Sequence, residues 1–526
     1  MKVTLSHCGG KAGVSSLRKS ILASLCWRDL KNFCAFSLLV VVISLESCSG
    51  PSKPIWSGTG QVSNAGLILT LRAAPLPAPA STNLLSFRTT VLGVSLTPET
   101  GGSVGVPLNS DSYQVDLARL QSDTSLLALS TSIPVGTYTN MVVSLSDAAV
   151  TYCMQTQGIT GCAAGSVTTL SGPPATPIIT TVPFPLVVAR GQNIGLAISV
   201  NMANALTVNG LTQAITAVNL GAADVLTAMT LPLASSSLPS ATLDFVEDVT
   251  GIVSSVDEAT QSVTIQTATK GPLTAIAGTS TTVSPNCTTF NLGDTFTCAK
   301  QGHVASLDTI LNPDGSLTLL EYDPLAITEG DWIEGIIGLP PLSSTQFQLV
   351  MNDFVLSNNN SLIRNNLKLG APVRITLENP KPFVVDSKGL VIPNSSFSGA
   401  VDASVLTPGQ TLALHVVSFT PGTGTTLAAA TVDFVYLRFT RVTGSVASAA
   451  PPNTFAIQSL PSFFGLILPV TVQLSSISPA TNFDGVSSAS ELVSGQTASI
   501  RALYFGPPTG PTPTPSPFSA AKVRIF

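Results

Sequence analysis

The chain contains few residues of the types and spacings that enzymes use for catalysis. Residues 101–105 (GGSVG) match G-x-S-x-G, the pattern around a nucleophilic serine, but that serine needs a strand before it and a helix after it. Val106-Pro107-Leu108 follows instead, so we predict a hairpin turn. Outside the first 47 residues the chain has two histidines, His303 and His415. They lie in separate segments, which leaves little material for a Ser-His-Asp arrangement.

A group of acids is the second candidate for chemistry. Five carboxylates lie close together in the sequence: Glu321, Asp323, Glu329, Asp331 and Glu334. Two carboxyl groups that face each other across a cleft at about 5 to 10 Å can hydrolyse a glycosidic bond. The group falls between two of the repeats described below, and we therefore expect a solvated inter-module turn.

Sugar binding is the third possibility, because exposed aromatic rings form platforms for ligands with apolar faces. Outside the first 47 residues the chain has only two tryptophans, Trp56 and Trp332. Trp332 stands beside three of the acids named above and is the tentative ligand-binding residue. A position in the core or at a sheet edge is the alternative for this side chain.

The sequence predicts neither a metal ion nor another cofactor. Residues 312–316 (NPDGS) lack the spaced carboxylates and the final Glu of a calcium loop, and they predict a hairpin turn between two strands. His303 and His415 are too few ligands for a zinc site built with the close cysteine pairs.

Cysteine use predicts two disulfides. Cys153 is close to Cys162, and Cys287 is close to Cys298, each pair in a turn-rich segment. In an oxidising compartment such pairs close short loops, and each bridge contributes about 2–4 kcal/mol of stability.

The start of the chain predicts export. An apolar run at residues 33–45 follows Arg28 and Lys31 and ends in small residues, as in a signal peptide. The run is shorter than the roughly 20 apolar residues that span a bilayer. We therefore predict a signal peptide at residues 1–47. Its 27 residues before Arg28 make an unusually long leader, which suggests a start codon placed too far upstream.

The end of this segment, Leu45-Glu46-Ser47-Cys48, resembles a bacterial lipoprotein signal, in which the cysteine is acylated and becomes the new N-terminus. Glu46 departs from that pattern, and an ordinary signal with a chance cysteine is the alternative. The resemblance implies lipidation of Cys48, a tether at residues 48–55, and attachment to the membrane of the cell envelope. Ser49 implies the outer membrane.

Charge argues against nucleic acid as a partner. Residues 1–47 hold six of the 23 basic residues and two of the 28 acidic ones, so the rest of the chain has 17 basic and 26 acidic residues and a formal charge of −9. Binding to nucleic acid depends on clustered Lys and Arg, and no basic run exists in this part.

Composition predicts an all-β protein. Hydrophobic residues make up 44% of the chain but charged residues only 10%, against about 25% in an average soluble domain. Ser, Thr, Gly, Pro, Val and Leu fill the difference, as is typical of strands joined by tight turns. Residues 117–130 come nearest to a helical pattern.

The first domain is predicted at residues 56–232 from strand-like runs and turn signals. Val94-Ser95-Leu96, the segment 113–117 (YQVDL) and the segment 133–139 (IPVGTYT) are its most distinctive parts. On these motifs the domain resembles an uncharacterised domain family of bacterial surface lipoproteins. The resemblance implies a β-sandwich of immunoglobulin or transthyretin type and no known activity.

The rest of the chain repeats itself, which predicts β modules near 249–325, 333–436 and 442–526. Each begins with a strand around a V-x-G-x-V or similar pattern and continues through a turn into an alternating strand, so we expect three hairpins. Closing strands also align, at 241–246, 430–435 and 521–526. These patterns resemble small barrel-like modules of a second uncharacterised bacterial family.

Together these features predict an exported, non-catalytic, lipid-anchored envelope protein with a structural or adhesive display role. An envelope protein or a glycan is the expected partner besides the membrane. The alternative is a glycan-binding or polysaccharide-associated surface lipoprotein, and a hydrolase ranks third.

Overall fold

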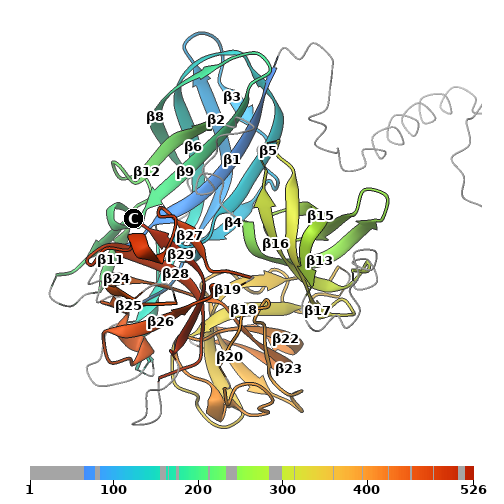
Figure 1. Ribbon diagram of the computed structural model, residues 1–526, viewed down its shortest axis with the longest axis vertical. Coiled ribbons are helices and arrows are strands. Elements are labelled where there is room, and N and C mark those ends of the chain that lie inside the picture. Colours follow the sequence, from blue (N-terminus) through green and yellow to red (C-terminus); the bar gives the residue numbers. More distant parts are fainter. Residues whose placement is uncertain are drawn as a thin grey trace, which may run out of the picture. The chain divides into compact units, whose positions relative to one another are not determined.

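The computed structural model describes residues 64–76, 83–153, 161–163, 165–172, 177–210, 212, 214–232, 246–283, 299–312, 314–358, 360–393, 395–424, 426–450, 453–477, 479–507 and 516–526. The predicted signal peptide, Cys48, the tether, and the pair Cys287 and Cys298 lie outside these residues. Strands make up 57% of the structure and helices 4%, which confirms the all-β prediction (Figure 1). Within the described ranges, no helix is long and apolar enough to cross a bilayer.

The N-terminal part is a sandwich of two sheets. The first sheet has the order β12-β9-β1-β5: β1 (Asn64–Ala74), β5 (Ser125–Pro134), β9 (Asn193–Asn201) and β12 (Leu226–Pro232). The second consists of β2 (Asn83–Pro98), β3 (Val104–Val106), β4 (Tyr113–Asp116), β6 (Gly136–Cys153), β7 (Val167–Ser171) and β8 (Ile178–Val188). Both sheets contribute to one core, which contains Leu69 and Ile198 from the first sheet and Phe87 and Met141 from the second.

Buried and exposed side chains alternate along these strands. Along β8, Val182, Phe184 and Leu186 are buried, whereas Pro183 and Pro185 face solvent. Two prolines fit because β8 pairs only with β6 and so lies at an edge, where proline is tolerated. The short elements η1 (Arg119–Gln121), α2 (Met202–Ala205), β10 (Leu206–Val208) and β11 (Ile215–Val218) complete this part.

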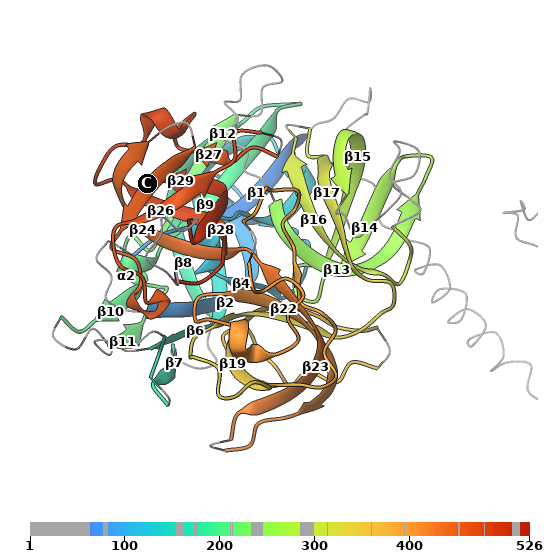
Figure 2. The same cartoon turned by 60° about the horizontal axis from the view of Figure 1, so that its bottom comes forward.

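Three closed sheets follow, and we call them barrels 1, 2 and 3 (Figures 1 and 2). Barrel 1 contains β13 (Val246–Asp257), β14 (Ser262–Gln266), β15 (Pro272–Val283), β16 (Val304–Leu311) and β17 (Leu317–Ala326). Barrel 2 contains β18 (Trp332–Ile337), β19 (Gln346–Val355), β20 (Pro372–Leu377), β22 (Thr411–Thr420) and β23 (Ala428–Arg438), with β21 (Val384–Val385) added beside β23. Barrel 3 contains β24 (Thr440–Ala450), β25 (Thr454–Gln458), β26 (Val470–Leu474), β28 (Thr497–Tyr504) and β29 (Phe518–Ile525), with β27 (Asn482–Asp484) beside β29. Short 3-10 turns lie at η2 (Ala403–Val405), η3 (Ser462–Phe464) and η4 (Ala489–Glu491).

All three barrels have the same strand order. The first two strands form a hairpin, the first also pairs with the fourth, and the third runs parallel to the fifth. Five strands in this Greek-key order resemble the arrangement of OB-type barrels. The three predicted hairpins are therefore confirmed.

A glycine in the first strand explains the repeated V-x-G-x-V pattern. Gly251, Gly335 and Gly444 occupy equivalent positions, where a Cβ atom would lie 2.4 to 2.5 Å from a backbone carbonyl oxygen of the strand or turn that follows. Those oxygens belong to Gln266, Val350 and Gln458. Because only glycine lets the two backbones approach so closely, the residue recurs at the start of each barrel.

The predicted turns are also confirmed. Residues 99–103 connect β2 to β3, which pair antiparallel, so Ser103 lies in a hairpin turn rather than on a nucleophile elbow. Asn312 and Ser316 close the turn between β16 and β17. Residues 117–130 form η1 and part of β5, and no long helix.

The closing strands of barrels 2 and 3 lie where the repeat alignment places them. Residues 430–435 belong to β23, and residues 521–525 belong to β29, which pairs with β28 and β26. Of the first aligned copy only Val246 is described, and it begins β13. The described residues all belong to one compact unit, so the sandwich and the barrels contact one another.

Candidate functional site: a buried charged junction

Buried charged side chains connect the sandwich with all three barrels. We call this set the charged junction. Its acids are Asp123, Asp248, Asp308, Glu321, Asp323, Glu334, Asp353 and Asp386, and its bases are Arg119, Lys270, Lys388, Arg438, Arg441 and Arg501. In a chain that is only 10% charged, this concentration of charge inside the molecule is its most unusual feature.

Asp248 is the centre of the junction. A bulge between Val246 and Val249 places it on β13 with a positive φ of 51°. Its fully buried carboxylate lies within 2.6 to 3.1 Å of nitrogens on four cations: Lys388, Arg438, Arg441 and Arg501. Burial opposes ionisation, but these four cations outweigh it and hold the pKa of Asp248 well below its ordinary value.

The cations around Asp248 belong to two different barrels. Lys388 and Arg438 come from barrel 2, and Arg441 and Arg501 come from barrel 3. Asp248 itself is in barrel 1, so a single carboxylate connects three sheets. Removing it would leave buried cations without their central partner, which costs several kcal/mol.

Arg438, at the end of β23, spreads its guanidinium over several acceptors. Its Nη2 donates to Asp248 Oδ1 at 3.1 Å and to Ser306 Oγ at 2.8 Å, and its Nη1 donates to Asp386. Its Nε lies 3.4 Å from Glu334 Oε2. Arg438 is completely buried, and the surrounding acids raise its pKa although burial alone would lower it.

The sandwich enters the junction through η1 and the residues after it. Arg119 Nη1 lies 2.8 Å from Glu334 Oε1 in barrel 2, and Asp123 Oδ2 lies 2.7 Å from Arg441 Nη2 in barrel 3. Burial opposes the charge of Asp123, yet Arg441 and Arg119 lower its pKa. The junction therefore joins four separate sheets or barrels.

The last strand reinforces the same contact. Arg524 on β29 is almost completely buried, and its Nη1 donates to the carbonyl oxygens of Leu120, Gln121 and Asp123 at 3.0 to 3.2 Å. Its Nε donates to Asp484 at 2.6 Å. Hydrogen bonds thus connect the C-terminal strand β29 to the end of η1 in the sandwich.

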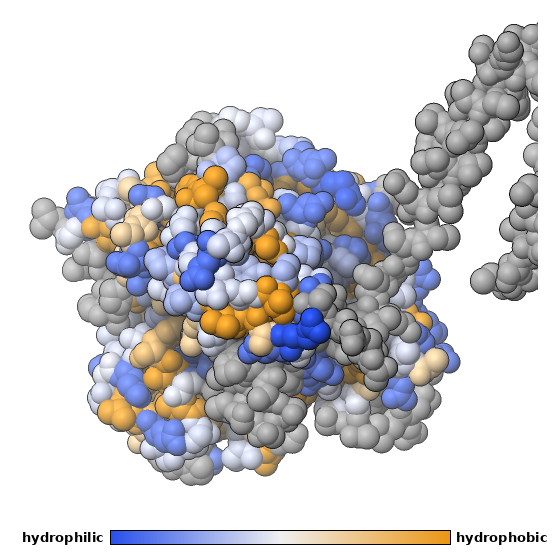
Figure 3. All heavy atoms as spheres, turned by 90° about the horizontal axis from the view of Figure 1, so that it is seen from above, coloured by the Kyte–Doolittle hydropathy of each residue, from blue (hydrophilic) through white to orange (hydrophobic). Residues whose placement is uncertain are grey.

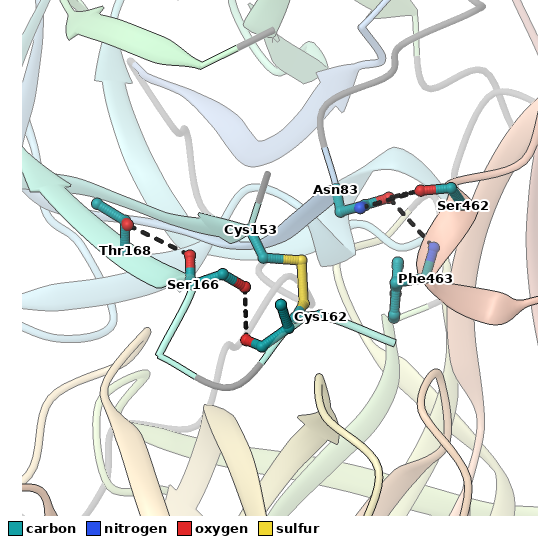
Figure 4. The surroundings of a disulfide bond; sticks show 8 residues. Asn83, Cys153, Cys162, Ser166, Thr168, Ser462 and Phe463 are labelled. Carbon is teal, nitrogen blue, oxygen red and sulfur yellow. Dashed lines mark hydrogen bonds between the residues drawn. A yellow bond between two sulfur atoms is a disulfide. The ribbon is translucent and has the colours of Figure 1, made fainter. Parts of the chain in front are cut away.

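A disulfide lies near the contact of the sandwich with barrel 3, where Asn83 accepts hydrogen bonds from Ser462 and Phe463 (Figure 4). Cys153 and Cys162 are bonded, as predicted, and both are buried. The Cys162 amide donates to the Gly338 carbonyl in barrel 2 at 2.7 Å, and the Gly161 amide donates to the Phe463 carbonyl in barrel 3 at 2.8 Å. The end of the loop that this disulfide closes therefore touches both barrels at once.

The predicted solvated cluster of acids is wrong. Glu321, Asp323, Asp331 and Glu334 are at most 7% exposed, and only Glu329 faces solvent. Asp331 accepts backbone hydrogen bonds from the loop after β19, and three of the others belong to the junction. The cationic partners of Asp323 and Glu334 are distant in sequence, so no local pattern marks these acids as buried.

Trp332 does not form an exposed platform, so its tentative assignment as a ligand-binding residue is corrected. Its side chain is 2% exposed and packs against Tyr436, Phe434 and His415, with ring centroids 5.4 to 6.4 Å apart. It fills the contact between barrels 1 and 2, where Leu325 belongs to the same apolar cluster.

His415 is the one histidine with a described acidic partner. Its Nδ1 lies 2.6 Å from Asp433 Oδ1, and both side chains are a little over one-quarter exposed. Val416 and Val417 follow it on β22, and Phe434 packs edge-on against the ring. A catalytic role would need a nucleophile beside this pair, and none of its described contacts supplies one.

A hollow lies between the segment 390–393 and barrel 3. Its volume is about 380 Å³, and Leu390, Val391, Ile477, Gln473 and Ser519 are among the side chains that line it. None of its lining residues is charged. In the parts of the chain that the structure covers, no group of three or more His, Cys, Asp or Glu is arranged to hold a metal ion.

No family model matches this chain, and no curated protein matches it. The two family resemblances therefore rest on the sequence motifs that suggested them, and they stay predictions.

Proposed function

We propose that this protein is a non-catalytic, lipid-anchored protein of the bacterial cell envelope that presents a rigid β structure for support or adhesion. The charged junction is the observation that carries this proposal. Its acids and bases connect four β units, and Asp248 alone contacts four cations from two barrels.

Rigidity follows from the energetics of buried ion pairs. Separating one barrel from the others would leave several charges desolvated and unpaired, and each broken buried pair costs about 3–5 kcal/mol. Arg524 and the disulfide loop add contacts at other points of the same unit. Motion of one barrel against another is therefore strongly disfavoured.

Buried pairing also removes these groups from possible chemistry. A catalytic acid or base must reach a substrate, whereas the side chains of Asp248, Arg438, Lys388 and Asp323 are at most 4% exposed. Their arrangement suits cohesion.

The surface has a different character. The edge strand β8 exposes Ile179 and Val187 by more than 65%, together with Thr181. Figure 3 shows hydrophobic residues scattered among polar ones on one face of the molecule. Scattered single apolar side chains are ordinary on protein surfaces, so only the exposed row on β8 is proposed as a contact with another surface.

Cell adhesion tests the proposal. We would delete the gene, complement it with the wild type or with Cys48→Ser, and measure attachment of the cells and the accessibility of the protein to added protease. Display predicts that attachment falls on deletion and returns only with the anchored form.

Equal attachment of all strains would contradict a display role. A glycan array with the purified protein separates the alternative, because selective binding to one polysaccharide class would favour a glycan-binding lipoprotein. Turnover of any glycan on the array would contradict a non-catalytic protein.

A further inference from the structure

The charged junction contains more acids than bases. Over the described residues its eight carboxyl groups face six cations, and every side chain with a described ion pair except Lys270 is at most 10% exposed. A buried charge without an opposite partner costs several kcal/mol, so the group takes its neutral form instead. Arg524 also contacts the junction at Asp123, so the described residues leave a surplus of at least one acid. The carboxyl groups whose burial the cations compensate least are therefore expected to hold a proton, and two stand out.

Glu321 is the first of these two. It lies on β17 opposite Asp308 of β16 and Thr282 of β15, and Asp323 follows two residues later on its own strand. No ion pair with Glu321 exists in the part of the chain that the structure describes. Lys388, the base that acts on Glu321, already lies 3.0 to 3.1 Å from three aspartates. Burial, with Asp323 second, raises the pKa of Glu321 to about 10.

Asp386 is the second. It follows β21 and contacts Arg438, but that guanidinium is shared with Asp248 and Glu334. Asp323 of β17 and Lys388 of its own segment also face it. Burial and then Asp323 raise the pKa of Asp386 to about 7, because a shared cation compensates only part of the desolvation.

We infer that the folded protein binds two extra protons in the charged junction, one at Glu321 and one at Asp386, and that they form a pH-sensitive lock that is tight in mild acid and loosens in alkali. Loss of each proton adds a negative charge to a site that already has surplus acid. An ionised Glu321 repels mainly Asp323 and Asp308 within barrel 1. An ionised Asp386 of barrel 2 repels Asp323 of barrel 1.

The direction of the pH dependence follows from linkage. An ordinary carboxyl group in the unfolded chain loses its proton near pH 4, whereas these two keep it in the folded state. The folded state therefore binds more protons above pH 4, and the free energy of unfolding falls as the pH rises. For each proton that only the folded state retains, the folding equilibrium constant falls about tenfold when the pH rises by one unit.

Denaturant unfolding of the full-length protein between pH 5 and pH 9 tests the lock. For the wild type we expect the folding constant to fall by about a hundredfold per pH unit below pH 6.5 and by about tenfold per unit above pH 7.5. In Glu321→Gln the folding constant should fall about tenfold less per pH unit than in the wild type, over the whole range from pH 5 to pH 9. In Asp386→Asn the same reduction of the slope should occur only below pH 7. The reason in both variants is that the amide imitates the protonated acid.

Two exposed acids provide matched controls. Glu99→Gln and Asp111→Asn make the same chemical changes at exposed positions of the sandwich and should leave the slope unchanged. A wild-type stability that is flat or rises from pH 5 to pH 9 would overturn the inference, and so would a slope that Glu321→Gln leaves intact.

A measurement on the wild type alone covers the case in which a variant does not fold. Infrared spectroscopy at pH 8 should detect the carbonyl band of a protonated carboxyl group in the folded protein, and unfolding should abolish it. Absence of that band in the folded protein would show Glu321 to be ionised and would overturn the inference.

Discussion

Asp248 and Arg441 are 193 residues apart in the chain, yet Oδ2 of the aspartate lies 2.6 Å from Nη2 of the arginine. The contact joins the first strand of barrel 1 to the first strand of barrel 3. Strands that begin two copies of the same repeat thus meet through charges that the repeat pattern does not contain.

Asp248→Asn should destabilise the protein strongly. The substitution keeps the shape but removes the charge that four cations share, so the free energy of unfolding should fall by about 3–5 kcal/mol. Urea unfolding measures it, with Asp111→Asn as an exposed control. A loss no larger than that of the control would show that the junction does not hold the barrels together.

Gly444→Ala should destabilise barrel 3, because the new Cβ would lie 2.5 Å from the Gln458 carbonyl oxygen. The expected loss is about 1–3 kcal/mol, as for other overpacked positions. Gly105→Ala is the control, since a Cβ there would meet no atom within 4 Å. Thermal melts of both variants decide the point, and equal melting temperatures would refute the account of the repeated glycine.

Loss of the disulfide between Cys153 and Cys162 should cost about 2–3 kcal/mol, because it closes a short loop. The double variant Cys153→Ser/Cys162→Ser should also be cut faster by protease near Gly338 and Phe463, whose carbonyls the loop contacts. Stability and cleavage equal to those of the oxidised wild type would contradict this. Mass spectrometry of unreduced peptides would show in the same samples whether Cys287 and Cys298 are bonded.

Deletion of residues 519–526 should open barrel 3. It removes nearly all of β29, including buried Val523 and the Arg524 contacts with the carbonyl oxygens after Leu120. We therefore expect faster proteolysis of barrel 3 and a weakened contact with the sandwich, while the sandwich core keeps its fold. Limited proteolysis with peptide mapping tests this, and a truncated protein as resistant as the intact one would contradict the role of β29.

Cys48→Ser should release the protein from membranes, because the predicted acylation requires the thiol. One acyl chain gives only marginal binding, so stable attachment needs more than one. Cell fractionation and palmitate labelling measure the effect, with Cys162→Ser as a cysteine variant that should stay attached. Retention and labelling of Cys48→Ser would refute the lipid anchor.

The sequence alone determined the local structure. Alternating side chains and turn residues act over a few positions, so the strands at 262–266 and 454–458, the turn at 312–316 and the hairpins around Gly251 and Gly444 could be predicted. The spacing of Cys153 and Cys162 likewise predicted their bond. Each of these features depends on neighbours that are close in the chain.

Tertiary structure decided which charges are buried. In the sequence, Asp323 and Glu334 resemble part of a polar turn, because their partners Lys388 and Arg438 lie at distant positions. A charged residue is buried at low cost only when an oppositely charged side chain lies beside it. The topology of the chain determines which distant residues lie beside it.

Trp332 is a second case in which distant residues decide burial, here between an exposed platform and a core position. A tryptophan beside three acids is most often a core or edge residue but can also form an exposed platform, since the sequence does not show what covers its rings. Barrel 1 supplies Leu325 and barrel 2 supplies Tyr436 and Phe434, and these contacts bury the side chain. Packing between barrels is a property of the complete fold, so only the tertiary structure could assign Trp332 to the core.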